Sequence, residues 1–321
     1  MKMNSNTIKI IKAEPKDVLG IAEVKKVTWL ATYPNKKAGI TIEDLQKSNF
    51  FDIEKIKRRQ KEIRENINRQ FWVAKDDKKT VGFCGAMREK EKYEIGAIYV
   101  LPEYQGQGIG KMFIDKAFVW LGGNRDIIVK VVSYNKQAIN FYKTVGFKLA
   151  KGVKKSEWHK LACGKLLPEI EMLRKGVKCK LATINDTKIL LKLNSLLDLE
   201  EKNKKEKISE AVKKKLIWVA ECDKKIVGYV LVRLFDKMHE QLPNSVFLSD
   251  LCVLDNYRGQ GIGRMLVQKT LDKKYPKQYH YFSLTHDPKE KDLTNFYKTF
   301  GFKVKGKTKA GNVKLVKNII V

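Results

Sequence analysis

Two glycine-rich turns, each between a strand-like and a helix-like segment, are the features of this sequence most able to do chemistry. The first lies within Val100–Met112 and the second within Val253–Met265, and each holds three alternate glycines. Glycine lets the backbone approach a bound group closely, and the start of a helix offers N–H groups together with a positive dipole. We therefore expect each turn to bind an anion, with a phosphate group as the best fit.

The turns belong to a longer repeat, because two further blocks recur in the same order. Trp72–Gly82 is echoed by Trp218–Gly228, and both read as an antiparallel hairpin with a charged turn. Asn140–Lys148 and Asn295–Lys303 differ at one position of nine. A match this close, at the distance of a domain, indicates a duplication of one fold.

The predicted domain boundary lies near Gly176, in a basic joint that follows the strand-like segment Glu169–Leu173. It divides the chain into domains 1–175 and 176–321. Each is long enough to bury a core of its own.

Composition limits the classes of protein. With 43% hydrophobic residues the 321-residue chain is too apolar for a disordered one. Its net charge is +30, mostly from scattered lysines. This charge fits either a solvated surface or a polyanionic partner; nucleic acid stays a less favoured alternative, because no basic stretch is interleaved with aromatic residues.

The sequence also bears on location and metals. No apolar run approaches the roughly 20 residues of a membrane span, and the amino terminus does not resemble a signal peptide. The five cysteines and four histidines show no metal-ligand or catalytic spacing. We expect a cytoplasmic protein with reduced thiols and no metal, in which the histidines are structural or surface residues.

Known nucleotide motifs do not account for the turns. A Walker A loop needs Gly-Lys-Ser/Thr, whereas Lys111 and Arg264 are each followed by methionine. A dinucleotide fingerprint has the spacing G-x-G-x-x-G in a βαβ unit, whereas these glycines alternate after strands that read as antiparallel.

The chain resembles the GNAT-type N-acetyltransferases over nearly its whole length, as two copies. Gln105-x-x-Gly108-x-Gly110 and Arg258-x-x-Gly261-x-Gly263 are similar to the acyl-CoA pyrophosphate loop of that family, and the Asn-Phe-Tyr-x-x-x-Gly-Phe block to its later helix and strand. The resemblance implies an α/β (α+β) fold: two tandem acyl-CoA N-acyltransferase domains, each a mixed, mostly antiparallel splayed sheet flanked by helices. It implies acetyl-CoA as acyl donor.

The resemblance assigns the coenzyme's diphosphate to the loop N–H groups, and its pantetheine arm to the strand before the loop, as an added strand would pair. The first copy offers Ile98, Val100, Gln105, Gly106, Gln107, Gly108, Ile109, Gly110 and Lys111, with Asn135 contacting the cofactor arm. The second copy offers Leu251, Val253, Arg258, Gly259, Gln260, Gly261, Ile262, Gly263 and Arg264, but Glu290 stands where the first has Asn135.

Acetyl transfer to an amine needs a neutral amine, a site for the oxyanion and a proton for the leaving thiolate. The resemblance makes Tyr142 the proton donor to sulfur, with Tyr297 as its counterpart; the alternative is that both tyrosines belong to the core. Glu94, on the strand before the first loop, is the candidate proton acceptor, or simply a solvent-facing residue. The repeat places Phe247 at its position in the second copy, where Asp250 is the nearest acid.

Trp29 and Tyr33 are candidates for the acceptor cleft, with a role in the first-helix core as the equal alternative. A backbone N–H near Ala97 is the candidate for holding the thioester oxygen.

The sequence thus predicts direct acetyl transfer from acetyl-CoA to an amine in a ternary complex, with the first domain as the better candidate for the active site. The acceptor would be an amine-bearing small molecule or a peptide N-terminus, and no acid cluster favours an aminoglycoside-like acceptor. The chain would be a monomer with pseudo-dimeric tandem domains, or a homodimer. The alternative is a non-catalytic acyl-CoA-binding or regulatory module associated with RNA or ribosomes.

Overall fold

The structure is a computed structural model that describes residues 8–65, 67–90, 93–150, 159–197, 203–239 and 242–319. The chain folds into two compact units, Met1–Gly176 and Val177–Val321. Unit 1 and unit 2 below mean these two segments, and each is described by itself.

Unit 1 is built on a seven-stranded sheet in which every pair of neighbours is antiparallel except β4 and β5. The sheet order is β1 (Lys9–Lys12), β2 (Arg69–Asp76), β3 (Lys79–Arg88), β4 (Tyr93–Val100), β5 (Ile127–Val132), β9 (Glu169–Arg174) and β6 (Lys148–Leu149). A separate two-stranded ribbon pairs β7 (His159–Lys160) with β8 (Leu166–Leu167).

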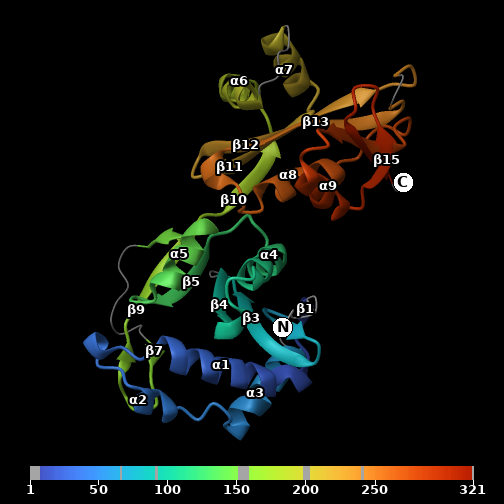
Figure 1. Cartoon of the computed structure of the whole chain (residues 1–321). Coiled ribbons are helices and arrows are strands. Elements are labelled where there is room, and N and C mark those ends of the chain that lie inside the picture. The colour runs from blue at the N-terminus through green and yellow to red at the C-terminus, as the bar shows by residue number, and fades with distance from the viewer. Residues whose placement is uncertain are drawn as a thin grey trace. The chain divides into compact units, whose positions relative to one another are not determined.

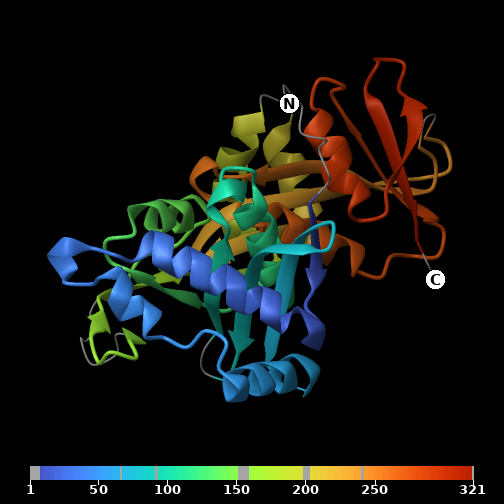
Figure 2. The same ribbon diagram turned by 60° about the horizontal axis from the view of Figure 1, so that its bottom comes forward.

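Helices cover both faces of this sheet, because β3 is buried on both sides and needs a partner on each. The helices are α1 (Val18–Thr32), α2 (Ile42–Gln46), α3 (Ile53–Glu65), α4 (Ile109–Leu121) and α5 (Lys136–Thr144). Figure 1 shows α1 on one side of β3 and β4, and α4 on the other. Figure 2 shows α1, in blue, lying across these strands.

The sheet of unit 1 opens in its middle. β4 and β5 are paired only at Tyr93 with Ile127 and at Glu94 with Ile128. Beyond Glu94 the two strands diverge, and a register shift against β3 leaves Gly96 as a bulge in β4. Bulges commonly redirect a strand beside a functional site. The facing edges of β4 and β5 are therefore free of strand partners beyond this point.

Unit 2 repeats this plan. Its seven-stranded sheet runs β10 (Val177–Leu181), β11 (Ile217–Cys222), β12 (Lys225–Phe235), β13 (Ser245–Val253), β14 (Tyr281–His286), β16 (Val313–Asn318) and β15 (Lys303–Lys307). The one parallel pair in this sheet is β13 with β14, which ends at Phe247 with Ser283. The helices are α6 (Thr187–Asn194), α7 (Lys204–Lys213), α8 (Ile262–Leu271) and α9 (Lys291–Lys298).

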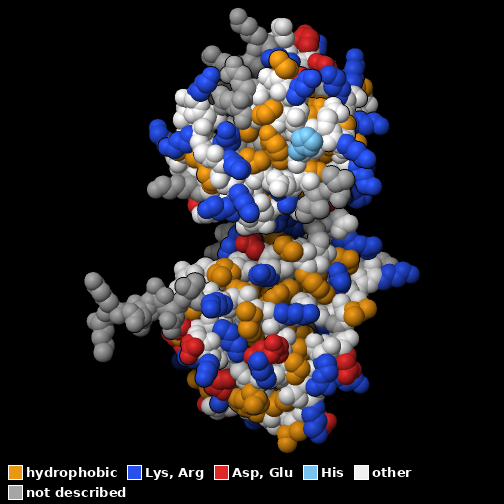
Figure 3. Space-filling model, turned by 90° about the vertical axis from the view of Figure 1, so that its right-hand side faces the viewer, with side chains coloured by type: hydrophobic (Ala, Val, Ile, Leu, Met, Phe, Trp, Pro, Cys, Tyr) orange, Lys and Arg blue, Asp and Glu red, His pale blue; other side chains and the backbone are white. Residues whose placement is uncertain are grey.

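The predicted fold is confirmed: each unit is a mixed, mostly antiparallel splayed sheet flanked by helices. Cys84, Cys222 and Cys252 lie in strands and are buried. Within the described segments, no helix has the length and apolar character needed to cross a bilayer. On the face seen in Figure 3, Lys and Arg side chains are spread over both units, in line with the net charge of +30.

Candidate active site

The glycine turn of unit 1 forms an open cradle at the start of α4. Gly106 and Gly108 have φ angles of +76° and +79°, which glycine adopts without strain. A Cβ atom on either residue would meet nothing within 4 Å, so this side of the loop is open. Gly108 is the N-cap of α4, and the N–H groups of the first helical turn have no partner within the helix. The cradle can therefore accept an anion.

Gly110 has a different role from the other two glycines. A Cβ atom there would approach the ring of Phe141 to 3.3 Å. The absence of a side chain at this position lets α4 and α5 approach each other beside the cradle.

One side chain ties each glycine turn to the end of the strand before it. In unit 1, Gln105 Nε2 donates to the carbonyl of Val100 at 3.0 Å, and Gln105 Oε1 accepts from Gln137 Nε2 at 3.1 Å. In unit 2, Arg258 Nε donates to the carbonyl of Val253 at 3.0 Å. Two different residue types thus make the same loop-to-strand bond.

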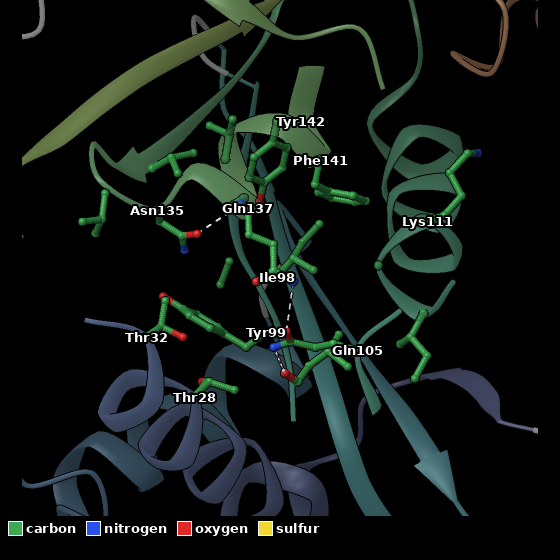
Figure 4. A pocket seen from close by; sticks show the side chains of 18 of the residues that line it. Thr28, Thr32, Ile98, Tyr99, Gln105, Lys111, Asn135, Gln137, Phe141 and Tyr142 are labelled. Atoms are coloured by element: carbon green, nitrogen blue, oxygen red, sulfur yellow. Dashed lines mark hydrogen bonds between the residues drawn. The ribbon is translucent and has the colours of Figure 1, made fainter. Parts of the chain in front are cut away.

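A cavity of about 510 Å³, called the donor cavity here, lies beside the cradle of unit 1. Figure 4 shows Tyr142 and Phe141 of α5 on one side of it and Thr28 and Thr32 of α1 on the opposite side. Nine of the residues predicted to bind acetyl-CoA line the donor cavity: Ile98, Val100, Gln105, Gly106, Gly108, Ile109, Gly110, Lys111 and Asn135.

Gln107 does not line the donor cavity. Its side chain is exposed and donates back to the carbonyl of Glu103 at 3.3 Å. Asn135 lines the cavity and is also the N-cap of α5, because its Oδ1 accepts from the N–H of Ala138 at 3.0 Å. The asparagine therefore fixes the start of the helix that carries Tyr142.

Tyr142 is a core residue that also lines the donor cavity, and its role as proton donor stays a prediction. Its ring lies in the core, 5% exposed, and meets Phe141 and Phe147 edge to face. The residue also lines the donor cavity. Burial, with smaller effects from Cys84 and Tyr99, raises its pKa well above the usual value for a phenol. Its hydroxyl therefore keeps its proton at neutral pH and can donate a hydrogen bond.

A second cavity, of about 610 Å³, meets the donor cavity at the splay between β4 and β5. We call it the acceptor cavity. The residues common to both cavities are Tyr33, Gly96, Ala97, Tyr99, Lys130 and Val132. Two ligands could therefore meet across the sheet at the Gly96 bulge.

Two carboxylates line the acceptor cavity, Glu94 from β4 and Glu169 from β9. Burial and the neighbouring Glu94 raise the pKa of Glu169, against the lowering effects of the His159 N–H and of Lys130. The His159 N–H donates to Glu169 Oε2 at 3.2 Å. The sequence did not point to Glu169 as a candidate site residue. Its strand β9 is far from β4 along the chain, and no sequence pattern indicates that the two residues line the same cavity.

Trp29 and Tyr33 line the acceptor cavity and are also core residues, 6% and 7% exposed. Their place in the core is confirmed, and their role toward an acceptor stays a prediction. His159 lies at the surface, as expected; it also lines the same cavity and meets the Trp29 ring edge to face. Burial and Lys25 lower its pKa, so its imidazole is neutral at pH 7.

Unit 2 keeps the cradle. Gly259 and Gly261 have φ angles of +72° and +80°, with nothing within 4 Å of an added Cβ atom. Tyr297 is 6% exposed, and burial together with Glu290 raises its pKa to about 12. Glu290 occupies the N-cap of α9, as Asn135 does on α5, but makes no side-chain cap bond. A negative charge thus stands beside the second tyrosine.

Asp250 of unit 2 belongs to a polar network in the wall of a cavity of about 300 Å³. It is 4% exposed and takes the strand position that Ala97 has in unit 1. Its Oδ2 accepts from Asn194 Nδ2 at 3.0 Å and from the Tyr229 hydroxyl at 3.2 Å, and its Oδ1 accepts from Ser249 at 2.6 Å. Both oxygens are therefore already engaged.

Among the residues that the structure describes, no three His, Cys, Asp or Glu side chains gather in a way that could hold a metal ion.

Comparisons with known proteins agree with this architecture. The family model described as an acetyltransferase (GNAT) domain matches residues 68–149 and 213–304, together more than half of the chain. Peptidyl-lysine N-acetyltransferase YjaB of Salmonella typhimurium is 37% identical over 79 residues, which are 24% of this chain and 50% of that protein. Thialysine N-epsilon-acetyltransferase of Sus scrofa is 45% identical over 65 residues, 19% of this chain and 36% of that protein.

The chain thus spans half or less of the length of these curated relatives. Among solved structures, the PaiA N-acetyltransferase of Thermoplasma acidophilum in complex with coenzyme A is 24% identical, with a TM-score of 0.43, over 52% of this chain and 98% of that one. Because both halves match the same family model, the chain belongs to the GNAT acetyltransferase family and carries two copies of its domain.

Proposed function

We propose that this protein transfers an acetyl group from acetyl-CoA directly to a primary amine, and that unit 1 is the active site. One observation carries the proposal: the donor and acceptor cavities of unit 1 meet at the splayed strands, with Tyr142 on one side and Glu94 and Glu169 on the other. This arrangement suits two substrates bound at once, so no covalent acetyl-enzyme is required.

The cradle and the open edge of β4 would hold the acyl donor. The N–H groups from Gln105 to Lys111 would bind its diphosphate, because the loop is open and helix α4 begins there. Main-chain groups of β4 beyond Glu94 have no partner on β5, so an extended pantetheine arm could pair with them. When bound, acetyl-CoA supplies the thioester that the amine attacks.

The acceptor amine must lose a proton to become a nucleophile. Glu94 and Glu169 line the cavity where the amine would lie, and either carboxylate could take this proton through water. Because its pKa is raised, Glu169 is a stronger base than an ordinary carboxylate and joins Glu94 as a candidate. From the neutral amine, the new N–C bond forms as the C–S bond breaks; the nitrogen then gives up one further proton, and the sulfur gains one, so this step is balanced.

Tyr142 would act on the leaving sulfur. Its protonated hydroxyl can donate a hydrogen bond to the thiolate as charge develops there. Since a phenol with a raised pKa gives up its proton reluctantly, we assign Tyr142 mainly to stabilising the thiolate, with the proton arriving at sulfur late in the step. The bulge at Gly96 would leave the Ala97 N–H free to approach the thioester oxygen.

For unit 2 we propose coenzyme binding with little or no turnover. Its cradle matches that of unit 1, which supports binding. Phe247 replaces Glu94, and Asp250 has both oxygens engaged, so neither of these two positions offers a free base. The Glu290 carboxylate beside Tyr297 would also oppose a developing thiolate.

Release of free thiol from acetyl-CoA tests the proposed activity, with a panel of amines and N-terminal peptides. We expect release with at least one amine and a loss of about 100-fold or more in Tyr142→Phe, the range of one transition-state hydrogen bond. Coenzyme binding without release for any amine, together with salt-sensitive co-sedimentation with RNA, would favour a non-catalytic binding module instead.

A further inference from the structure

The acceptor cavity of unit 1 and the hollow next to it are rich in positive charge. The adjoining hollow, of about 460 Å³, shares Lys25, Trp29, Arg59, Phe83, His159 and Lys160 with the acceptor cavity. Among the residues that the structure describes, seven Lys and Arg side chains line the two together, against the two carboxylates Glu94 and Glu169. The seven are Lys25, Lys55, Arg58, Arg59, Arg69, Lys130 and Lys160.

Lys25 is a positively charged side chain in a partly buried setting. It is half-buried on α1 in the wall between the two hollows. Its ammonium lies 4.4 Å from the centre of the Trp29 ring, and no described carboxylate is within ion-pair distance. Burial, Arg59 and Lys55 lower its pKa to about 8. Among the described residues, Lys25 is thus a partly desolvated cation with no carboxylate paired to it.

Arg59 is only partly neutralised. It shares a single carboxylate with Arg69: Arg59 Nε lies 3.4 Å and Arg69 Nη1 lies 3.7 Å from oxygens of Glu62. The two guanidinium groups together carry two positive charges and Glu62 carries one negative charge, so this cluster has a net positive charge. The Arg59 guanidinium lies 4.5 Å from the centre of the Phe71 ring, which holds its plane beside the cavity.

The acceptor cavity has a negatively charged residue near one end and positively charged residues near the other. Glu94 lies two residues before Gly96, where the acceptor and donor cavities meet. Lys25 and Arg59 lie where the acceptor cavity continues into the adjoining hollow. A ligand with a positive end and a negative end would match this order.

We propose that the acceptor amine also carries an anionic group, a carboxylate or a phosphate, which binds to Lys25 and Arg59 while the amine lies near Glu94 and Glu169 at the splay. The inference rests on the proposed function and names its substrate class. Amino acids, acidic peptides and phosphorylated amines belong to this class, whereas polyamines and other purely cationic amines do not.

Matched pairs of acceptors test the proposal on the full chain. Lysine is compared with cadaverine, which lacks the carboxylate, and phosphoethanolamine is compared with ethanolamine. A charge-assisted hydrogen bond of about 1.5–3 kcal/mol corresponds to a factor of about 10–100. We expect kcat/KM for the anionic member of at least one pair to exceed that of its partner by this factor. A preference within the lysine–cadaverine pair would identify the anionic group as a carboxylate, and one within the phosphoethanolamine–ethanolamine pair would identify it as a phosphate.

Substitution of Lys25 then assigns the effect to the site. Lys25→Met removes the charge but keeps a long side chain, and we expect it to lower the anionic-to-neutral ratio of kcat/KM by about 10-fold or more. Lys26→Met is the control, because Lys26 lies on the same helix and lines neither hollow. A preference for the neutral or cationic partner, or an unchanged ratio in Lys25→Met, would overturn the proposal.

A binding measurement separates this inference from the proposed function. If no amine releases thiol, calorimetry with lysine and with phosphoethanolamine in the presence of coenzyme A still reports on the site. Binding that weakens 10-fold in Lys25→Met, and not in Lys26→Met, would support the anion site although the transferase activity had failed. No heat with either compound would refute it.

Discussion

The hydroxyl groups of Tyr33 and Tyr99 lie 3.0 Å apart and share a hydrogen bond where the donor and acceptor cavities meet. Tyr33 comes from the end of α1 and Tyr99 from β4, so this bond connects the helical layer to the splayed strand. Burial raises the pKa of both tyrosines, so neither loses its proton at neutral pH. The bond therefore fixes the position of the helix that forms the acceptor side.

Removing both of these hydroxyls should cost less stability than the two single removals added together. Tyr99→Phe leaves the buried Tyr33 hydroxyl without its partner, which costs about 1–3 kcal/mol of the free energy of unfolding. In the double variant Tyr33→Phe/Tyr99→Phe no orphaned hydroxyl remains, so its cost should be smaller than the sum of the two single costs. Urea denaturation measures this. Tyr281→Phe, at a half-buried tyrosine of unit 2, is the control.

The two cradles should each bind one coenzyme A. We expect calorimetry to give two sites per chain, one of which is lost in Gly108→Ala and the other in Gly261→Ala. Alanine is strained at φ angles of +79° and +80°, and its methyl group would stand on the open face of the loop. Gly164→Ala is a matched control, because its φ angle of +88° and open surroundings give the same strain outside the cradle. Retention of both sites in Gly108→Ala would contradict the assignment.

The fold was predictable because the repeat made each half a check on the other. The glycine cradles, the hairpins and the Asn-Phe-Tyr block are local patterns, and the structure places the first-copy cradle, Asn135 and Tyr142 around one cavity. Glu169 was beyond reach, because only the pairing of β5 with β9 brings it to the side of Glu94. The burial of Asp250 could not be predicted from the sequence either, because its three hydrogen-bond partners come from α6, β12 and its own strand.

Glu169 provides a pH test of the acceptor cavity. Its pKa is raised in the folded protein, so the folded state binds its proton more tightly than the unfolded chain does. The contribution of this group to stability is therefore fully present below the unfolded pKa of about 4.3 and is lost as pH rises through the folded value. Glu169→Gln should accordingly be more stable than the native protein at neutral pH, with the difference vanishing below about pH 4.

The same variant bears on catalysis. If Glu169 accepts the amine proton, Glu169→Gln lowers kcat/KM by about 100-fold at pH 7, within the range of general-base catalysis. Glu94→Gln tests the other candidate, and Glu171→Gln on the same strand is the control. An unchanged rate in both Glu94→Gln and Glu169→Gln would rule out carboxylate catalysis here.

Asp250 should prove to stabilise unit 2 and to contribute nothing to proton transfer. Asp250→Ala removes the acceptor of the Tyr229 hydroxyl and one of the two acceptors of Asn194 Nδ2, so buried hydrogen bonds are lost. We expect a cost of about 1–3 kcal/mol in the free energy of unfolding, measured by denaturant titration. Coenzyme release by the full chain should be unaffected. A large loss of turnover at unchanged stability would instead make Asp250 a base in unit 2.

The preference for anionic acceptors should weaken as the pH rises through about 8. Lys25 titrates there because burial, Arg59 and Lys55 disfavour its charged form. The pKa of His159 is lowered, so its imidazole titrates below this range, whereas Lys25 changes charge within it. The measurement is the ratio of kcat/KM for phosphoethanolamine and ethanolamine between pH 6.5 and 9.5, a ratio that removes effects common to both substrates. In Lys25→Met the fall near pH 8 should disappear; if it persists, another group is responsible.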